Sequence, residues 1–428
     1  MYTCFKSIKK KCSLIDWLDY IQNLNPVLVD LNLDRIKKVA TVLKLIPFQI
    51  YSILVGGTNG KGTTCYLLEQ ILLFNNFKVG LYTSPHLLSY SERIRVCGKQ
   101  LPDDIHIKSM SVVENARSGV LLTYFEFITL SALNIFKQFK LDLVILEVGL
   151  GGRLDATNII DPDISVITNI AIDHVDFLGD TRYKIAIEKS GIFRVNRPAI
   201  VGEIDRPLVI DEIAKNCSSI LFARGRDWDF YCCKDNTWIW RCYSESHGLL
   251  INFPMPLSIP LENAAVVLSI LHWLPFKVSR KSIEYGLQNA VLLGRFQVVN
   301  YNPFIVLDVG HNPHAAAHVK NKLHPIVLKR KGIVRIVIGM LSRKDVKSTV
   351  LCLNNLIDVW YCADLNTPCS ANMKYVFDCF SGFDVKYFED IISAWYKAVD
   401  DSDIDDCILV FGSFYAVHPI LKLILKIM

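Results

Sequence analysis

Apolar runs alternate with helical patterns of apolar and polar residues along most of the chain. Residues 51–57 (YSILVGG) have the composition of a buried strand, and the pattern after them predicts a helix over about 62–74. Two further buried strands are predicted at 141–149 and 164–170, with helical spacing over 123–139. Because strand–helix–strand repetition is typical of a parallel sheet covered on both faces, we predict an α/β fold.

A second α/β pattern begins near residue 300. It comprises strand-like runs at 304–310, 334–340 and 407–413 and a helical pattern at 312–323, whereas residues between 200 and 260 form shorter, more polar strand-like pieces. A chain of 428 residues is too long for one ordinary core. Within 292–299 a helical pattern gives way to a strand, so we predict domains at 1–296 and 297–428.

Composition narrows the class of protein. Half of the residues are apolar and the net charge is only +5, which suits acidic small-molecule substrates and gives no support for nucleic-acid binding. The 13 cysteines are scattered with no C-x-x-C pair, which favours a reduced, cytoplasmic location. No stretch approaches the roughly 18 apolar residues of a membrane span. We expect the C-terminal segment HPILKLILKIM to pack as a helix end.

A glycine-rich turn follows the first buried strand, in GGTNGKGTT. Such a turn directs backbone N–H groups towards a phosphate, and Lys61 and Thr63 could reach the β/γ-phosphates and Mg²⁺. The usual phosphate-loop pattern is imperfect, because Val55 replaces its first glycine and Gly62 separates the lysine from the threonine. A turn without a ligand is the alternative. The residues predicted to contact ATP here are Gly57, Thr58, Asn59, Gly60, Lys61, Gly62 and Thr63.

Two polar residues follow the other buried strands. Glu147 ends the second strand, and His174 comes soon after the third. In an open α/β sheet, ligands bind outside the carboxyl ends of the strands, so both residues are candidate metal ligands. A lone histidine is more often a surface or core residue, and an imidazole is an unusual partner for magnesium.

Several motifs occur in order along nearly the whole chain and together resemble one family. They are GGTNGKGTT, SPHLLSYSERIRV, TYFEFITLSAL, LEVGLGGRLDATNII, NIAIDHVDFLG with EKSGIF, LLGRFQ, DVGHNPHAA and GSFYAV. This arrangement resembles the folylpolyglutamate synthase/dihydrofolate synthase family of the Mur ligase superfamily, and within it the bifunctional type. The resemblance implies a phosphate-loop, parallel-sheet ATP-binding domain of the Mur central type, followed by a smaller Rossmann-like C-terminal domain.

The resemblance also implies the chemistry. Enzymes of this family activate a pteridine carboxylate as an acyl phosphate with ATP, and the α-amine of glutamate then attacks it. The implied substrates are dihydropteroate, tetrahydrofolate, L-glutamate and ATP. Mg²⁺, as two ions, would be bound by Thr63, Ser84, Glu147 and His174, and Lys61 would bear charge at the transferred group. Lys189 corresponds to the family's carbamylated lysine (N6-carboxylysine), and a salt bridge to Glu188 or another acid is the alternative.

The remaining site residues are also carried over from the family. Asn263, Arg295 and Asp308 would contact the nucleotide, and His311 and Ser413 the reacting groups or glutamate. Leu293 replaces the proline that is common before Gly294. The pterin would be bound by three segments, namely Asp30, Leu31, Asn32 and Leu33, then Thr123, Tyr124, Phe125 and Glu126, then Leu154, Asp155 and Ala156. Phe125 offers a flat apolar face and Asp155 an acceptor, whereas Tyr124 is equally compatible with an ordinary core position.

The sequence also allows alternatives to an ATP-dependent folate ligase. A peptidoglycan-precursor ligase is disfavoured by the pterin segments, and a non-ligating nucleotide switch by the second α/β domain with its DVGHNP motif. A degenerate, inactive member is disfavoured because Lys61, Glu147, His174, Lys189 and Arg295 are all present. A monofunctional member of the family remains open. The family's habit suggests a monomer, and we expect neither a nucleic-acid nor a membrane partner.

Overall fold

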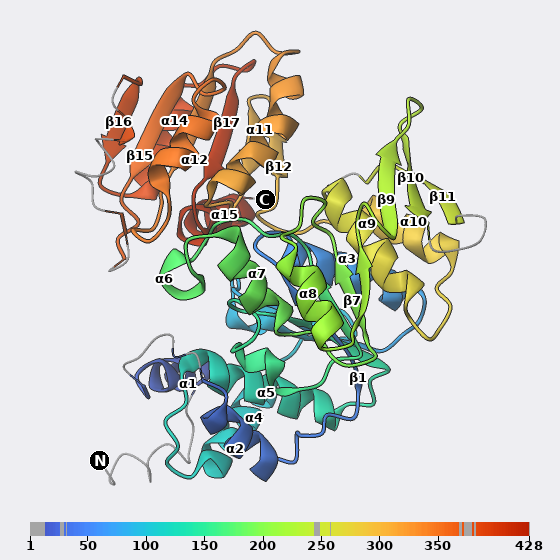
Figure 1. The fold of residues 1–428 in the computed structure, drawn as a ribbon. Helices are drawn as coiled ribbons and strands as arrows, with labels where there is room; N and C mark the ends of the chain where they lie inside the picture. The colour runs from blue at the N-terminus through green and yellow to red at the C-terminus, as the bar shows by residue number, and fades with distance from the viewer. Residues whose placement is uncertain are drawn as a thin grey trace. The chain divides into compact units, whose positions relative to one another are not determined.

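The computed structural model describes residues 13–25, 30, 32–243, 249–256, 258–367, 370–371, 379–380 and 382–427. The chain forms two compact units, drawn in Figure 1. The N-terminal unit comprises Met1–Ile172 and Leu178–Ala290, and the C-terminal unit comprises Asp173–Phe177 and Val291–Met428. The short segment 173–177 therefore belongs to the C-terminal unit although its neighbours in sequence do not.

The N-terminal unit is built on an eight-stranded sheet. Six of its strands pair in parallel, and two short antiparallel strands extend one edge. Across the sheet they are β4 (Lys99–Gln100), β3 (Ile94–Val96), β2 (Val79–Tyr82), β5 (Leu143–Glu147), β1 (Tyr51–Gly56), β6 (Ile164–Ile167), β7 (Pro198–Val201) and β8 (Ile220–Ala223). β1 and β5 are buried almost throughout because helices cover both faces, which explains their continuous apolar sequences.

Helices form a layer on each face of this sheet. One layer contains α3 (Lys61–Phe74), α9 (Leu261–His272) and α10 (Arg280–Asn289), which pack with the strands in one hydrophobic core. The other contains α1 (Leu14–Gln22), α2 (Asp34–Val42), α4 (Asp103–Arg117) and α5 (Tyr124–Gln138), which contact one another. Helices α7 (Arg182–Ser190) and α8 (Val209–Asn216) pack together, and η1 (Tyr90–Arg93) and η2 (Ala156–Ile159) are short 3₁₀ turns.

A small antiparallel sheet completes the N-terminal unit. It contains β9 (Trp228–Cys232), β10 (Thr237–Cys242) and β11 (Leu249–Pro254). Trp228, Trp238 and Trp240 are fully buried and belong to the same core as α3 and α9. This sheet therefore extends the core that holds the phosphate-loop helix.

The C-terminal unit is a six-stranded sheet with helices on both faces. Its strands, in order, are β12 (Gln297–Tyr301), β13 (Phe304–Leu307), β17 (Cys407–Phe411), β14 (Val334–Ile338), β15 (Val359–Ala363) and β16 (Val385–Phe388). Only the β12–β13 pair is antiparallel among these described strands. Helices α11 (Pro313–Val327) and α12 (Val346–Leu353) pack together, and α14 (Ile391–Asp400) packs with α15 (Phe414–Ile427).

The structure confirms the predicted fold class and its principal elements. The strands predicted at 51–57, 141–149, 164–170, 304–310, 334–340 and 407–413 are β1, β5, β6, β13, β14 and β17, each somewhat shorter than predicted. The C-terminal segment is α15, in which Ile420 and Leu421 are fully buried. In the part of the chain that the structure describes, no helix is long and apolar enough to cross a membrane. The segment 175–178, which forms α6 (Val175–Leu178), was not predicted.

Candidate active site

The glycine-rich turn joins β1 to α3 and has the geometry of a phosphate loop. Gly60 precedes the first residue of α3 with a φ of 80°, in the left-handed region that favours glycine. Asn263, on α9, donates hydrogen bonds from Nδ2 to Gly60 O (3.1 Å) and Thr64 Oγ1 (3.0 Å). A Cβ on Gly60 would lie 2.2 Å from that amide nitrogen. The structure therefore brings Asn263 to the loop, as its predicted nucleotide role requires.

A second segment, which sequence analysis did not identify, supports the loop from the end of β6. Thr58 N donates to Asn169 O (3.0 Å), and Asn59 N donates to Asn169 Oδ1 (2.9 Å). Asn169 Nδ2 returns a hydrogen bond to Asn59 O (2.9 Å), and Thr168 Oγ1 donates to the same carbonyl (2.7 Å). Because the amide side chain of Asn169 pairs with both the N–H and the carbonyl group of Asn59, it fixes the backbone of the turn at Asn59.

Lys61 lies over this turn. Its Nζ donates to Gly57 O (3.1 Å) and Thr58 O (3.3 Å). The ammonium is therefore held at the mouth of the loop, and both of its described hydrogen-bond acceptors are neutral carbonyl groups. A cation in this position suits the negative charge of a transferring phosphoryl group.

Glu147 meets the same loop from the neighbouring strand. It ends β5, is buried, and accepts a hydrogen bond at Oε2 from Ser84 N (3.0 Å). A Cβ on Gly62 would lie 3.3 Å from Oε2, so this glycine lets the helix start approach the carboxylate closely. Thr63, the residue after Gly62, is buried. The N-terminal unit thus gathers three of the predicted metal ligands, Thr63, Ser84 and Glu147.

Their chemistry fits magnesium. Hydroxyl and carboxylate oxygens are hard donors, and magnesium in phosphate sites uses few protein ligands and completes its shell with phosphate oxygens and water. No group of three or more histidine, cysteine, aspartate or glutamate side chains suited to a metal occurs among the described residues. A bound Mg²⁺ would stabilise the charge that develops on the phosphates.

Lys189 lies near the end of α7 and is 97% buried, with 3% of its surface exposed. The carboxylate of Glu188, one partner that we considered for a salt bridge to Lys189, also pairs with another cation. Its Oε1 lies 2.8 Å from Arg153 Nη2. A lysine so deeply buried is rare unless it is paired or modified, and its carbamylation stays a prediction.

The predicted pterin segments at Asp30 and at 123–126 meet through one residue that sequence analysis missed. Arg35, on α2, binds Glu126 through Nε (2.8 Å to Oε2) and also pairs with the carboxylate of Asp30. Glu126 closes a capping box with Thr123 at the start of α5. Asn32 Oδ1 accepts a hydrogen bond from Asp34 N (2.7 Å), the first residue of α2, and Leu33 is the residue directly before that helix. Leu31 lies outside the described residues.

The aromatic pair of the pterin segment is only half-buried. Phe125 packs on Gly149, where an added Cβ would lie 2.5 Å from Cζ, and its ring stacks with Tyr82 at 6.1 Å. The Tyr124 ring lies 5.9 Å from the Arg93 guanidinium. The partial exposure of both rings argues against the ordinary core position that we considered for Tyr124.

Asp155 is buried in the neighbouring loop with Ala156, whereas Leu154 is half-buried. The Oδ2 atom of Asp155 accepts a hydrogen bond from Leu150 N (2.8 Å), and its Oδ1 atom accepts from the N–H and hydroxyl of Thr157. Burial raises the pKa of this carboxyl above its ordinary value. The carboxylate therefore organises its own loop, and its contact with a pterin amino group stays a prediction.

In the C-terminal unit, Arg295 lies shortly before β12 and Asp308 directly after β13, the strand that pairs with β12. The Arg295 guanidinium lies 5.1 Å from the Phe414 ring. The Asp308 carboxylate accepts from Phe296 N (2.8 Å) and Gly310 N (2.7 Å), and burial raises its pKa. These bonds fix the turn that leads from β13 to His311.

His311 and His174 lie in one polar cluster of the C-terminal unit. His311 Nδ1 is 2.9 Å from Val309 O, and burial followed by the nearby Lys344 charge lowers the pKa of His311 to about 4. His174 belongs to the 173–177 segment and lies with its Nε2 3.2 Å from Lys344 Nζ. Asp173 contacts both Lys344 and Asn312. Lys344 and Asp173 were not predicted.

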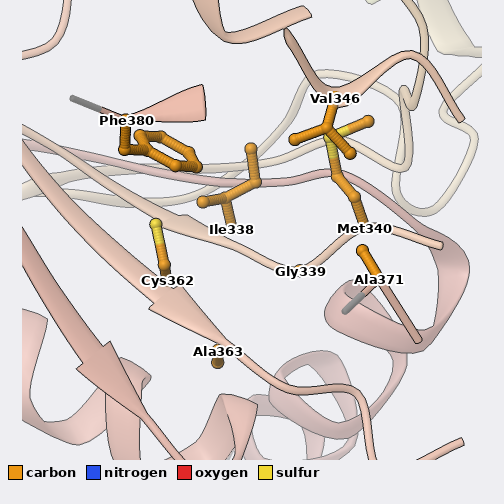
Figure 2. A pocket seen from close by; sticks show the side chains of 8 residues that line it. All are labelled: Ile338, Gly339, Met340, Val346, Cys362, Ala363, Ala371 and Phe380. Carbon is orange, nitrogen blue, oxygen red and sulfur yellow. The ribbon is translucent and has the colours of Figure 1, made fainter. Parts of the chain in front are cut away.

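Ser413 has a structural role at the start of α15. Its hydroxyl donates to Gly339 O (2.9 Å) and accepts from Ala416 N (3.0 Å). Gly339 also lines an apolar pocket at the carboxyl ends of β14 and β15, shown in Figure 2. Its lining residues are Ile338, Gly339, Met340, Val346, Cys362, Ala363, Ala371 and Phe380. None of the described residues that line this pocket is charged, so they do not suit the carboxylates of glutamate.

Two family models match the chain. The Mur ligase middle domain matches residues 55–231, and the Mur ligase glutamate ligase domain matches residues 294–414. The parallel sheets, the phosphate loop and these matches define a Mur-type ligase.

Individual relatives narrow this class. The dihydrofolate synthase/folylpolyglutamate synthase of Escherichia coli is 44% identical over 411 residues, covering 96% of this chain and 95% of the relative. The structure of E. coli FolC in complex with DHPP and ADP superposes with a TM-score of 0.92, covering 97% and 98% of the two chains at 44% identity. A bifunctional folylpolyglutamate synthase/dihydrofolate synthase with Mn, AMPPNP and L-glutamate bound gives 0.90 at 44% identity, covering 96% and 98%.

The chain belongs to the dihydrofolate synthase/folylpolyglutamate synthase family, and it is an ATP-dependent ligase. The resemblance inferred from the ordered motifs is thereby confirmed. The individual residue roles stay predictions, which the contacts described above support to different degrees.

Proposed function

We propose that this protein adds L-glutamate to 7,8-dihydropteroate, giving dihydrofolate, and adds further glutamates to tetrahydrofolate. In each reaction the pteridine carboxylate takes the γ-phosphoryl group of ATP, and ADP leaves. The α-amine of glutamate then attacks the acyl carbon, and phosphate leaves as the C–N bond forms. The relatives named for both activities and matched over nearly their whole length support this assignment.

One observation carries the proposal beyond nucleotide binding. Phe125 packs on Gly149, and Glu147, two residues earlier on the same strand end, contacts the phosphate loop at Gly62. The predicted pterin ring partner therefore packs against the short stretch of backbone, residues 147–149, that begins with the predicted metal ligand. An acceptor bound against Phe125 would have its ring anchored close to the site of phosphoryl transfer, which favours an oriented reaction.

Binding roles follow from this arrangement. Lys61 and a Mg²⁺ ion bound by Thr63, Ser84 and Glu147 would bear the charge of the transferring group. A second ion, His174 as a ligand and N6-carboxylysine at Lys189 belong to the same proposal. The domain limits at 296 and 297, the monomeric state and the cytoplasmic location also remain predictions from the sequence.

The test is release of ADP and phosphate from purified protein with ATP and Mg²⁺. We expect turnover only when 7,8-dihydropteroate and L-glutamate are both present, with dihydrofolate as the product. ATP hydrolysis that does not depend on glutamate, or an absence of turnover, would favour the nucleotide switch or an inactive protein.

A second assay separates the bifunctional from the monofunctional enzyme. Tetrahydrofolate should replace dihydropteroate as the glutamate acceptor in the same preparation. Turnover with only one of the two acceptors would show a monofunctional member. Lys61→Ala should abolish both activities while leaving the far-UV circular dichroism unchanged, because this loop lysine contributes little to the fold.

A further inference from the structure

Asp173 is the centre of a polar cluster in the C-terminal unit. Its Oδ1 accepts from Lys344 Nζ at 2.7 Å, and its Oδ2 accepts from Asn312 Nδ2 at 3.0 Å. His311 Nε2 lies 3.9 Å from Oδ2. The side chains of Asp173 and Lys344 are each only 8% exposed. One carboxylate thus contacts groups from two other segments of this unit in a largely dehydrated place.

The topology explains why these groups converge. His311 and Asn312 follow β13, and Lys344 follows β14, while both strands pair with β17 between them. All three strands are parallel, so the residues that follow them lie at one edge of the sheet. The crevice at the carboxyl ends of parallel strands is where open α/β sheets bind ligands.

The cluster can receive an anion through the N–H donors of Lys344 rather than through a net charge, because the paired charges of Lys344 and Asp173 cancel. Lys344 is a buried cation with three N–H donors, and His311 is kept neutral at pH 7 by its lowered pKa. Every substrate of this ligase reaction is anionic. A cation on a flexible four-carbon stem orients an anion only when something fixes its position. The carboxylate of Asp173 provides that restraint, and the loss of its charge would release the ammonium.

We propose that Asp173 is a positioning residue of the ligase reaction, which acts through Lys344 by holding this ammonium beside His311 to receive an anionic oxygen of a substrate. The oxygen belongs to a carboxylate of glutamate or to a phosphoryl group. This inference rests on the proposed function, because it assigns a role within that reaction.

The structural alternative is that the ion pair serves only stability. Removing one partner of a buried pair leaves an unpaired charge, so Asp173→Asn alone could lower activity by unfolding the unit. A double variant, Asp173→Asn with Lys344→Gln, removes both charges and leaves no unpaired ion. Asp173→Glu retains the charge on a longer side chain. Asp176→Asn, at an exposed position three residues along the same segment, is the matched control.

The experiment measures kcat and the KM of glutamate and of ATP for wild type and these variants, normalised to folded protein by circular dichroism. We expect Asp173→Asn to lower kcat/KM on the order of 100-fold, as expected for a displaced catalytic-site group. Asp173→Glu should recover part of this loss, and Asp176→Asn should behave as wild type. Lys344→Gln is measured as a single variant as well, and the double variant should be no worse than it, because Asp173 acts through the lysine.

The outcomes separate the sources of the anion and the failure modes. A rise mainly in the KM of glutamate assigns the oxygen to its carboxylate, and a rise in the KM of ATP or a fall in kcat alone assigns it to a phosphoryl group. Multiplicative effects in the double variant, or normal kinetics of the folded fraction of Asp173→Asn, would overturn the proposal. Wild-type protein without glutamate-dependent turnover would instead overturn the proposed function.

Discussion

Replacing Glu69 with glutamine should stabilise the protein at alkaline pH. Glu69 lies on α3, the helix that begins at the phosphate loop, and its side chain is fully buried. Its Oε2 is 3.1 Å from Arg95 Nη2, whereas its Oε1 has no hydrogen-bond partner among the described residues. Arg95 also donates to Gly98 O (2.9 Å). One arginine therefore compensates only part of the cost of burying this carboxylate.

The magnitude follows from the pKa. Burial raises the pKa of Glu69 from 4.5 to about 7, and the nearby Arg95 charge opposes this shift. Because the folded state holds the proton more tightly, the contribution of this group to stability is complete below pH 4.5 and is lost as the pH rises through 7. At about 1.4 kcal/mol per pKa unit, the loss reaches about 3 kcal/mol at pH 8. Glutamine does not ionise, so the variant escapes this loss.

The assay is urea denaturation followed by circular dichroism between pH 5 and 8.5, without nucleotide. The free energy of unfolding of Glu69→Gln should match wild type near pH 5 and exceed it by about 3 kcal/mol at pH 8. Glu284→Gln, which replaces an exposed carboxylate paired with Arg280, should show no such divergence. A variant less stable than wild type at pH 8 would refute the reasoning, because it would show that the ionised pair stabilises the fold.

Three further predictions concern the site. Gly60→Ala should weaken ATP binding in a calorimetric titration, because its Cβ would meet the amide of Asn263 at 2.2 Å, whereas Gly119→Ala, also at positive φ but with no atom within 4 Å of its Cβ, should not. Lys189→Ala should lose on the order of 100-fold in turnover and regain part of it with acetate. His311→Gln should resist acid better than wild type in unfolding assays between pH 6.5 and 4, because a folded-state pKa of about 4 removes stability over that range.

Each of these predictions has a contrary result. Equal ATP affinities of the Gly60 and Gly119 variants would show that the contact with Asn263 does not shape the nucleotide loop. An active Lys189 variant that gains nothing from acetate would favour a structural role for the amine. Parallel acid unfolding curves for wild type and His311→Gln would show that the ring does not stay neutral.

Much of the architecture could be predicted because six of the strands, β1, β5, β6, β13, β14 and β17, are short apolar runs in the sequence. The run at 51–57 predicted a strand covered on both faces, since Ile53, Leu54 and Val55 follow one another with no polar residue between them, and Lys61 with its flanking glycines located the loop at its end. Two residues that the structure brings to the loop were also named from the sequence, Glu147 because it ends a buried strand and Asn263 because the family resemblance implies it, and their roles stay predictions.

The residues that sequence analysis missed contact partners that are far from them in the sequence. Arg35 binds Glu126 across 91 positions, and Lys344 meets Asp173 across 171. Nothing local distinguishes these two cations from the other lysines and arginines, because only the folded chain shows which carboxylate each one meets. The division at Ala290 and the membership of segment 173–177 in the C-terminal unit likewise depend on long-range packing rather than on composition.

That segment also determines how the protein can be cut. The chain passes from one unit to the other at 172, at 177 and again at 290, so a break after Ala290 does not yield two complete pieces. A fragment beginning at Val291 would contain Lys344 without Asp173, and its buried ammonium would lose the counter-ion that the N-terminal fragment takes away. Expression of either half alone should therefore give poorly folded products, because a split at this position separates residues of the C-terminal unit from one another.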